Sequence, residues 1–361
     1  MCKPPEVGAL GRSQPRKSVS SCQALAENLD KVLQAMPALH RLALSARTFS
    51  GIAGSDVSAQ AASSCPSLLL LVHEQLDSVL HELRTTTSSG AVNAAALLLG
   101  MNVLVKLVAC LEALSFEGKK CAARVFVEVA ELGPRVRLDK LVSHQPLVEM
   151  LLAGFGKPGV FDHSAAMLQS LIKTPELHVI LLDAGVTFEL MRLAAEANFE
   201  ISCEAFFSLR ELLLKNPVSA AKFLMESFSD FFKQYHSLLV VESYTVLRQA
   251  ERLLGEILLQ QAFWQVRIAY INNENFLRIH MNLFRLTSVP LRLEAFHLFK
   301  IFVANSTRPS RVTNILRHNS DRLIALLQTF LGEGHEDEAF CTDLHTVIGL
   351  LRSLGRDQVP C

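Results

Sequence analysis

The apolar positions of this sequence repeat with a period of 45 residues. Three segments share the pattern: EAFFSLRELLLKNP from Glu204, QAERLLGEILLQQA from Gln249 and EAFHLFKIFVANS from Glu294. Each has a small residue followed by large apolar residues four and eight positions later, which places all three on one face of an α-helix. The equivalent positions are Ala205, Ala250 and Ala295, then Leu209, Leu254 and Phe299, then Leu213, Leu258 and Val303.

Fainter copies precede these three, in SAAMLQSLIKTP (164–175) and AARVFVEVAELGP (122–134). Pro134, Pro175 and Pro217 end several of the predicted helices, and a second helix is expected after each break, because proline is tolerated only in the first turn of a helix. A period of 41 to 45 residues made of two or three helices is typical of armadillo and HEAT repeats. We therefore predict an all-α, armadillo/HEAT-like helical-repeat solenoid, a curved rod with a concave binding face. It would form one domain over residues 21–361, capped by EAFCTDLHTVIGLLRSL (338–354), after a disordered tail at residues 1–20.

Charge and cysteine usage limit the classes of partner and the compartment. The 35 basic and 35 acidic residues balance, which argues against nucleic acid, because binding to a phosphate backbone needs a basic excess. Eight scattered cysteines without a CxxC pair predict reduced thiols and a cytoplasmic protein, with lipidation of Cys2 as the less favoured alternative.

The apolar stretch 91–114 is interrupted by polar residues and predicts a buried helix, not a membrane span. Two stretches rich in Ser, Thr and Gly, 47–67 and 84–91, predict loops.

The sequence offers little for catalysis, and we predict no enzyme and no cofactor. It contains no GxSxG, GxxxxGK[ST], HExxH or EF-hand motif. His335, Cys341 and His345 lie among acidic residues, but a solvated turn is favoured there over a metal site, so no metal is predicted. AGFGKPG (153–159) predicts a turn rather than a phosphate loop, and His297 predicts a structural histidine.

Cationic and large apolar side chains gather in the last third of the chain. Two interpretations stay open: a solvated basic ridge over a core with one buried indole, or a surface that binds a peptide or a protein domain. The second is favoured by residue type, since Arg, Trp and Met are enriched at protein interfaces. The residues are Arg248 and Arg252, one turn apart; Arg278, Arg285 and Arg292, at intervals of seven; Met281; and Trp264, the one tryptophan.

Several blocks of sequence resemble a known family. They are FEGKK (116–120), LLGEILL (253–259), HMNL (280–283), LEAFHLFKIFVAN (293–305) and EDEAF (336–340). In order and spacing they are similar to the calcium-binding protein 39 family, the "Mo twenty-five" scaffolds, with the best match over residues 67–355. The resemblance implies a non-catalytic scaffold that binds and allosterically activates a protein kinase or pseudokinase, of the STRAD, sterile-twenty or NDR kind. It also implies a monomer within a hetero-complex.

The resemblance further implies two recognition areas. One is a pocket for a Trp-Glu-Phe-like peptide tail, with matching positions Arg248, Arg278 and Met281. The other is the concave kinase-binding face, with matching positions Tyr244, Arg252 and Trp264.

This sequence departs from the family pattern at three positions. Gln261 stands where the family has Arg, His318 where it has Lys, and His280 where it has Met. These departures leave open the alternative of a divergent structural adaptor that has lost kinase activation and recruits cytoskeletal or cortical partners.

Overall fold

A computed structural model describes residues 22–36, 56–138, 145–330 and 338–356, and all regular secondary structure in these ranges is helical. The all-α prediction is therefore confirmed. The chain divides after Leu181 into two compact units, Met1–Leu181 and Leu182–Cys361, which we describe separately. The predicted single domain with a curved, concave shape stays a prediction.

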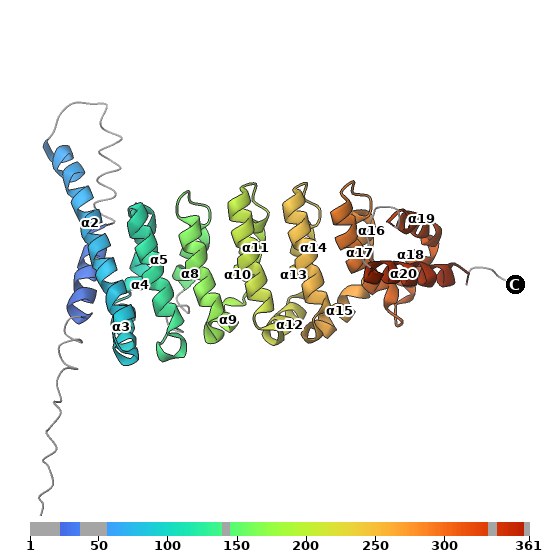
Figure 1. Ribbon diagram of the computed structural model, residues 1–361, viewed down its shortest axis with the longest axis horizontal. Helices are drawn as coiled ribbons and strands as arrows, with labels where there is room; N and C mark the ends of the chain where they lie inside the picture. Colours follow the sequence, from blue (N-terminus) through green and yellow to red (C-terminus); the bar gives the residue numbers. More distant parts are fainter. Residues whose placement is uncertain (1–21, 37–55, 139–144, 331–337, 357–361) are drawn as a thin grey trace, which may run out of the picture. The chain divides into compact units, whose positions relative to one another are not determined.

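Unit 1 is built from antiparallel helices, of which α2, α5 and α8 lie side by side (Figure 1). Its elements are a helix at residues 22–36, α2 (Asp56–Thr85), α3 (Ser88–Gly100), α4 (Val103–Cys110), η1 (Leu111–Ala113), α5 (Phe116–Glu131), η2 (Gly133–Arg135), α7 (Gln145–Gly154), α8 (Phe161–Lys173) and α9 (Pro175–Leu181).

Unit 2 continues the same pattern, with α11, α14 and α17 side by side (Figure 1). Its elements are α10 (Ala184–Ala194), α11 (Phe199–Leu214), α12 (Pro217–Glu226), α13 (Phe228–Leu238), α14 (Tyr244–Leu259), η3 (Gln261–Phe263), α15 (Trp264–Ile271), α16 (Glu274–Leu283), α17 (Val289–Ala304), α18 (Ser310–His318), α19 (Ser320–Phe330) and α20 (Glu338–Arg356).

The 45-residue repeat corresponds to α11, α14 and α17. All nine positions in register are fully buried, from Ala205 at the start of the series to Val303 at its end. The small residue near the start of each helix admits close approach of a neighbouring helix, and the larger residues fill the layer between helices. The helical-repeat prediction is thus confirmed at the level of single side chains.

Ion pairs follow the same period. Arg84 of α2 pairs with Glu128 of α5 at 2.5 Å, and Arg210 of α11 pairs with Glu256 of α14 at 2.8 Å. Lys157, after α7, pairs with Glu112 of η1 at 2.7 Å. Each pair joins residues 44 to 46 positions apart, but such exposed pairs contribute at most about 1 kcal/mol each. They mark the register of adjacent repeats, while burial supplies most of the stability.

The predicted proline breaks are confirmed at two helix starts. Pro175 and Pro217 are the first residues of α9 and α12, and Pro134 lies in the 3₁₀ turn η2. The side chain of Asn216 caps α12 by accepting a hydrogen bond from the amide of Ser219. The stretch 153–159 leaves α7 and forms turns, as predicted, with Gly159 in the left-handed region at φ +67°.

Three local predictions were wrong. The stretch 47–67 is helical from Asp56 onward, and residues 47–55 lie outside the described ranges. Only residues 86–87 of the predicted loop 84–91 lie outside helices. The stretch 91–114 is not one helix, because Asn102 adopts a left-handed conformation at φ 53° and separates α3 from α4.

Within the described ranges, no one helix combines the length and the apolar composition needed to cross a membrane. The segments Ser88–Gly100 and Val103–Ala113 meet that test only as a pair, with a bend of 65° between them.

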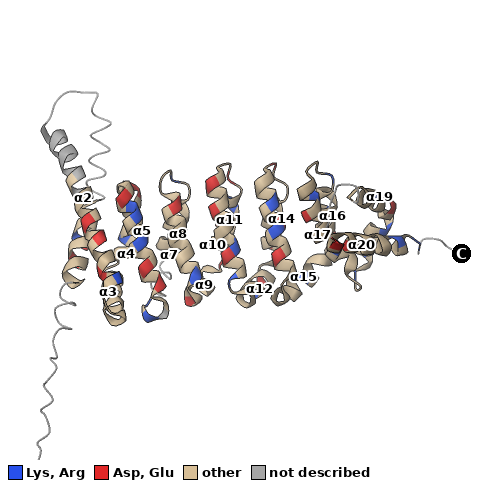
Figure 2. Cartoon of the chain, viewed as in Figure 1, with Lys and Arg blue, Asp and Glu red and all other residues tan. Residues whose placement is uncertain are grey.

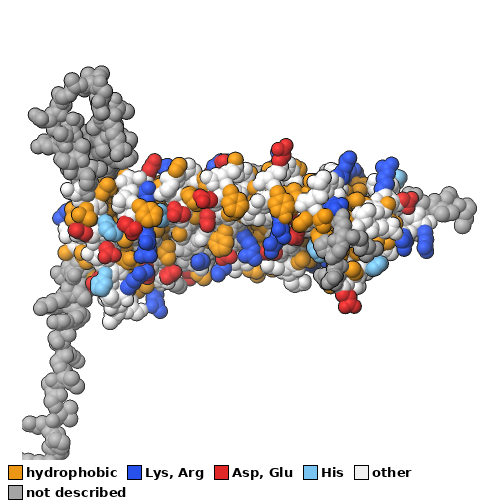
Figure 3. Space-filling model, turned by 45° about the horizontal axis from the view of Figure 1, so that its top comes forward, with side chains coloured by type: hydrophobic (Ala, Val, Ile, Leu, Met, Phe, Trp, Pro, Cys, Tyr) orange, Lys and Arg blue, Asp and Glu red, His pale blue; other side chains and the backbone are white. Residues whose placement is uncertain are grey.

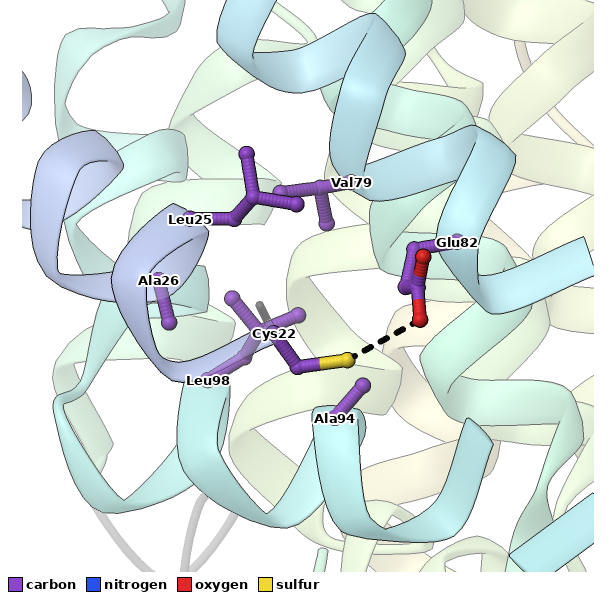
Figure 4. Close-up of a pocket in the computed structure, with 7 residues that line it drawn as sticks. All are labelled: Cys22, Leu25, Ala26, Val79, Glu82, Ala94 and Leu98. Atoms are coloured by element: carbon purple, nitrogen blue, oxygen red, sulfur yellow. Dashed lines mark hydrogen bonds between the residues drawn. The ribbon is translucent and has the colours of Figure 1, made fainter. Parts of the chain in front are cut away.

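The helix at residues 22–36 is attached to the other helices of unit 1 by polar and apolar contacts. The thiol of Cys22 donates to a carboxylate oxygen of Glu82 at 3.2 Å (Figure 4), and Lys106 pairs with Asp30. Burial, reinforced by Glu82, raises the pKa of Cys22 to about 11, so the thiol stays protonated and unreactive. The small pocket around the thiol is lined by Leu25, Ala26, Val79, Ala94 and Leu98.

Candidate partner-binding site

Three of the predicted residues form one row along α14. Tyr244, Arg248 and Arg252 are spaced by four residues, so they share a face of the helix, whose basic positions are visible in Figure 2. A guanidinium nitrogen of Arg248 donates to the hydroxyl of Tyr244 at 3.4 Å. Tyr244 is the first residue of the helix and is 44% exposed. We call these three residues the α14 row.

A groove between α11 and α14 borders the α14 row. Arg252 lines it and has no ion pair among the described residues, whereas Arg210 is neutralised by Glu256. The groove has a volume of about 340 Å³. Its lining residues are Cys203, Phe206, Phe207, Arg210, Gln249, Arg252, Leu253 and Glu256.

Phe207 is a candidate binding residue that the sequence analysis missed. Its ring is 46% exposed at the groove. The 45-residue register could have identified it, because position 207 is equivalent to Arg252, which is exposed on α14. An exposed aromatic ring beside the guanidinium of Arg252 suits a partner that combines apolar and acidic groups.

Trp264 lies at the start of α15 and is 50% exposed. Its neighbour Phe263, in η3, is fully buried and anchors the turn. The interpretation of a buried indole was therefore wrong. Gln261, in the same turn, is exposed and uncharged.

The other two pocket residues lie on a different helix. Arg278 and Met281 are on α16, which packs against α15 and α17. Arg278 is exposed and is held by Asn275 at 2.7 Å and by Glu274 at 3.7 Å, while Met281 is partly buried. The structure therefore unites Tyr244, Arg248 and Arg252 on α14 and places Arg278 and Met281 separately.

The arginines spaced by seven do not form a ridge. Arg278 lies on α16, Arg285 in the turn after it, and Arg292 on α17, where its guanidinium lies 5.3 Å from the centre of the Phe330 ring. His318, at the end of α18, is exposed. Acidic and basic side chains are interspersed on the visible face of both units (Figure 3).

His280 belongs to the core and not to the surface pocket. It is fully buried, and its Nε2 atom lies 2.8 Å from the hydroxyl of Tyr270, which lies 3.0 Å from Nε2 of His236. Burial lowers the pKa of His280 to about 3 and that of His236 to about 4, so both rings are neutral at physiological pH. The departure at position 280 therefore changes the packing beneath α16 and does not alter a contact surface directly.

The residues that could have suggested a metal site are only partly described. His335 lies outside the described ranges, while Cys341 and His345 are on α20. The structure, where it is described, contains no group of three or more His, Cys, Asp or Glu side chains that could hold a metal ion. His297 packs near Phe296 and Phe340 at ring distances of 6.0 and 6.1 Å, which agrees with a structural role.

Comparison with known proteins identifies the family. The family described as Mo25-like matches residues 58–355, from α2 to α20. The chain belongs to the Mo25-like family. Calcium-binding protein 39-like of Mus musculus is 31% identical over 255 residues, which are 70% of this chain and 76% of that protein. The Mo25-like protein of Schizosaccharomyces pombe is 32% identical over 258 residues, which are 70% of this chain and 78% of that protein.

The predicted resemblance is therefore confirmed, with slightly wider limits than 67–355. As a member of the Mo25-like family, the chain is a protein of the scaffold type. The match includes the α14 row, Trp264 and the α16 pair, so the whole candidate site lies within the family region.

Proposed function

We propose that this Mo25-like chain is a non-catalytic cytoplasmic scaffold that binds a protein kinase or pseudokinase and activates it allosterically. The contact surface is the α14 row with the adjoining α11–α14 groove and Trp264. A second proposed area combines Arg248 of α14 with Arg278 and Met281 of α16 and takes a Trp-Glu-Phe-like tail. The thiols of Cys22, Cys110, Cys121 and Cys203, which form no disulfide, support a reducing compartment.

The observation that carries the proposal is the exposure of binding-type side chains at the positions the resemblance implied. Tyr244 and Trp264 are about half exposed, although large aromatic side chains are usually buried. Arg252 faces the groove and has no ion pair among the described residues. Aromatic rings and arginines of this kind contribute most of the free energy of many protein interfaces.

Activation follows if the surface fits one conformation of the kinase better than another. A scaffold without catalytic groups shifts a kinase toward its active conformation only by the difference between its affinities for the two conformations. A tenfold difference corresponds to about 1.4 kcal/mol, which one additional aromatic or charge-assisted contact can supply. The partner's acidic groups would pair with Arg252, and its apolar groups would pack on Phe207 and Trp264.

A structural adaptor that has lost kinase activation is the second candidate. It is favoured by Gln261 and His318, which are exposed and which replace cationic residues of the family pattern. Loss of two cationic contacts would lower affinity for an acidic kinase surface without affecting the fold.

Affinity purification from native extract tests both candidates. Wild-type protein is compared with an Arg252→Glu, Trp264→Ala variant and with an Arg248→Ala, Met281→Ala variant, after circular dichroism has shown that each is folded. Lys222→Ala on α12 is the matched control, because Lys222 is exposed and pairs only loosely with Glu226 at 3.8 Å.

The scaffold proposal requires that a kinase or pseudokinase co-purify with wild type and the control. The first variant should lose the kinase domain, and the second should lose binding of a Trp-Glu-Phe peptide. A kinase that binds but gains no activity from the wild-type protein would favour the adaptor. Retention of every partner by both variants would show that the site is wrong.

A further inference from the structure

Glu251 occupies a core position that its sister helices fill with phenylalanine. In the 45-residue register it is equivalent to Phe206 of α11 and Phe296 of α17, and both rings are buried. Glu251 itself is 1% exposed. The helix that carries the α14 row thus places a carboxyl group where the neighbouring repeats place a benzene ring.

The carboxyl group of Glu251 has no compensating partner. Neither of its oxygen atoms has a hydrogen-bond partner among the described residues. Across the interface, α17 presents Glu294, whose charge opposes ionisation of Glu251. From α13, Tyr235 faces the same region, but its hydroxyl donates to the backbone carbonyl of Ala250 at 2.7 Å.

Several basic groups on the helices that pack against α14 are engaged elsewhere: Arg210 of α11 pairs with Glu256, His236 of α13 contacts Tyr270, Arg267 of α15 donates to the carbonyl of Leu258, and on α17 Lys300 pairs with Asp343 and Arg292 lies over Phe330. The remaining basic groups are Lys233 of α13, His297 of α17, and Arg248 and Arg252 of α14 itself, and none of them is among the causes of the shifted pKa of Glu251. Ionisation of Glu251 would therefore leave a buried negative charge without a counterion, which destabilises a packed interface strongly.

We propose that Glu251 is a proton-controlled joint between the α14 and α17 repeats. As a neutral acid it packs in the place of the equivalent phenylalanines and keeps the two helices together. When Glu251 loses its proton to solvent, the buried carboxylate becomes hydrated and α14 separates locally from α17. This separation displaces the α14 row. The joint is a property of unit 2; only its effect on partner binding depends on the proposed function.

The direction and range of the effect follow from linkage. Burial, together with the charge of Glu294, raises the pKa of Glu251 from 4.5 to about 8. When the interface opens, Glu251 is exposed to water and its pKa returns toward the ordinary value. The equilibrium constant for opening therefore rises about tenfold per pH unit between the two pKa values and levels off above the higher one. The neutral histidines His236 and His280 contribute only a slope of the opposite sign, which fades above pH 6.5 as the unfolded imidazoles lose their protons.

Hydrogen exchange on the full chain tests the joint without any partner. The opening constants of α14 and α17 amides are measured from pH 6.5 to about one unit above the pKa of about 8, after correction for the intrinsic exchange rate. In the wild-type protein, the opening constants should rise about tenfold per pH unit and level off near the pKa of Glu251. The fluorescence of Trp264, on the adjoining α15, should change with the same midpoint.

Three variants separate Glu251 from general effects of pH. Glu251→Gln keeps the shape but cannot ionise, so its opening constants should show no rise over this range. Glu256→Gln, a partly exposed acid on the same helix that pairs with Arg210, should keep the wild-type profile. Glu294→Gln removes the opposing charge and should move the levelling point to lower pH.

A Glu251→Gln protein with the wild-type slope would overturn the proposal, as would a wild-type protein whose α14 and α17 amides show no slope. If Glu251→Gln fails to fold, the Glu294→Gln variant decides instead: opening constants that level off at the wild-type pH would refute the proposal equally. None of these results depends on whether a kinase binds.

Discussion

Replacing Tyr270 by Phe should destabilise unit 2 strongly, although the change removes a single oxygen atom. The hydroxyl of Tyr270 lies between two imidazole rings, at 3.0 Å from Nε2 of His236 and 2.8 Å from Nε2 of His280. Because a tyrosine hydroxyl donates one hydrogen bond, one histidine accepts from it and the other donates to it. The variant loses both bonds and adds no new clash.

The expected loss is at the upper end of a range of about 1–3 kcal/mol, because two buried hydrogen bonds are lost together. A buried polar atom that loses its partner costs about 1–3 kcal/mol. His280 is fully buried and bears nearly all of that cost, whereas His236 is slightly exposed and can turn toward water. For a unit of this size, each kcal/mol lowers Tm by about 2–4 °C, so the melting temperature should fall by roughly 6–12 °C.

Thermal and urea unfolding, followed by the fluorescence of Trp264, measure the effect within unit 2. Tyr244→Phe is the matched control, because its hydroxyl is exposed and makes one long hydrogen bond of 3.4 Å to Arg248. The control should change stability by no more than about 0.5 kcal/mol. Equal changes in Tm for the two variants would show that the buried hydrogen bonds do not contribute as reasoned.

Other variants test the packing, the surface and the acid response. Ala250→Leu should cost about 1–3 kcal/mol by urea unfolding, since a fully buried small residue leaves no room for three more carbons. Arg210→Ala should cost at most about 1 kcal/mol in the same assay, because its ion pair with Glu256 is exposed. Met281→Ala should cost less than the roughly 2–5 kcal/mol of a core methionine, and a loss in that range would place Met281 in the core. Acid should destabilise unit 2 as pH falls from 6.5 toward 4, because the unfolded chain binds protons that the neutral rings of His236 and His280 do not bind. Each histidine contributes about 1.4 kcal/mol per pH unit, and above pH 4.5 Glu251 offsets about one of these two contributions; a flat stability profile over this range would contradict the neutral histidines.

The repeat could be predicted from sequence because helical packing imposes it on the sequence. Ala250, Leu254 and Leu258 lie on one buried face, and the same requirement recurs in each neighbouring helix. The breaks at Pro175 and Pro217 were equally predictable, since proline has a fixed place in a helix. In contrast, the break at Asn102 depends on a left-handed backbone conformation that neither composition nor apolar period reveals.

The site was less predictable, because exposure depends on neighbours distant in sequence. Position 264 is half exposed and position 263 fully buried, although both carry aromatic residues. Phe207 was missed for the same reason, and the burial of His280 depends on a tyrosine partner ten residues earlier that the spacing does not reveal. The row of Tyr244, Arg248 and Arg252 could be placed on one face, since helical spacing alone fixes that relation.

The buried polar groups of unit 2 oppose one another in their response to pH. His236 and His280 stabilise the folded state only when they are neutral, so their contribution is lost as pH falls below 6.5. Glu251 stabilises it only when protonated, so its contribution falls as pH rises from 4.5 to about 8. Between pH 4.5 and 6.5, the rise in stability with pH that comes from the two histidines exceeds the fall that comes from Glu251. Above pH 6.5 the fall from Glu251 dominates. For these three groups, the free energy of unfolding of unit 2 is therefore greatest near pH 6.5. Because Glu251 shares α14 with Arg248 and Arg252, a change in its charge acts on the helix that presents the candidate binding surface, which couples the core of this repeat to its exterior.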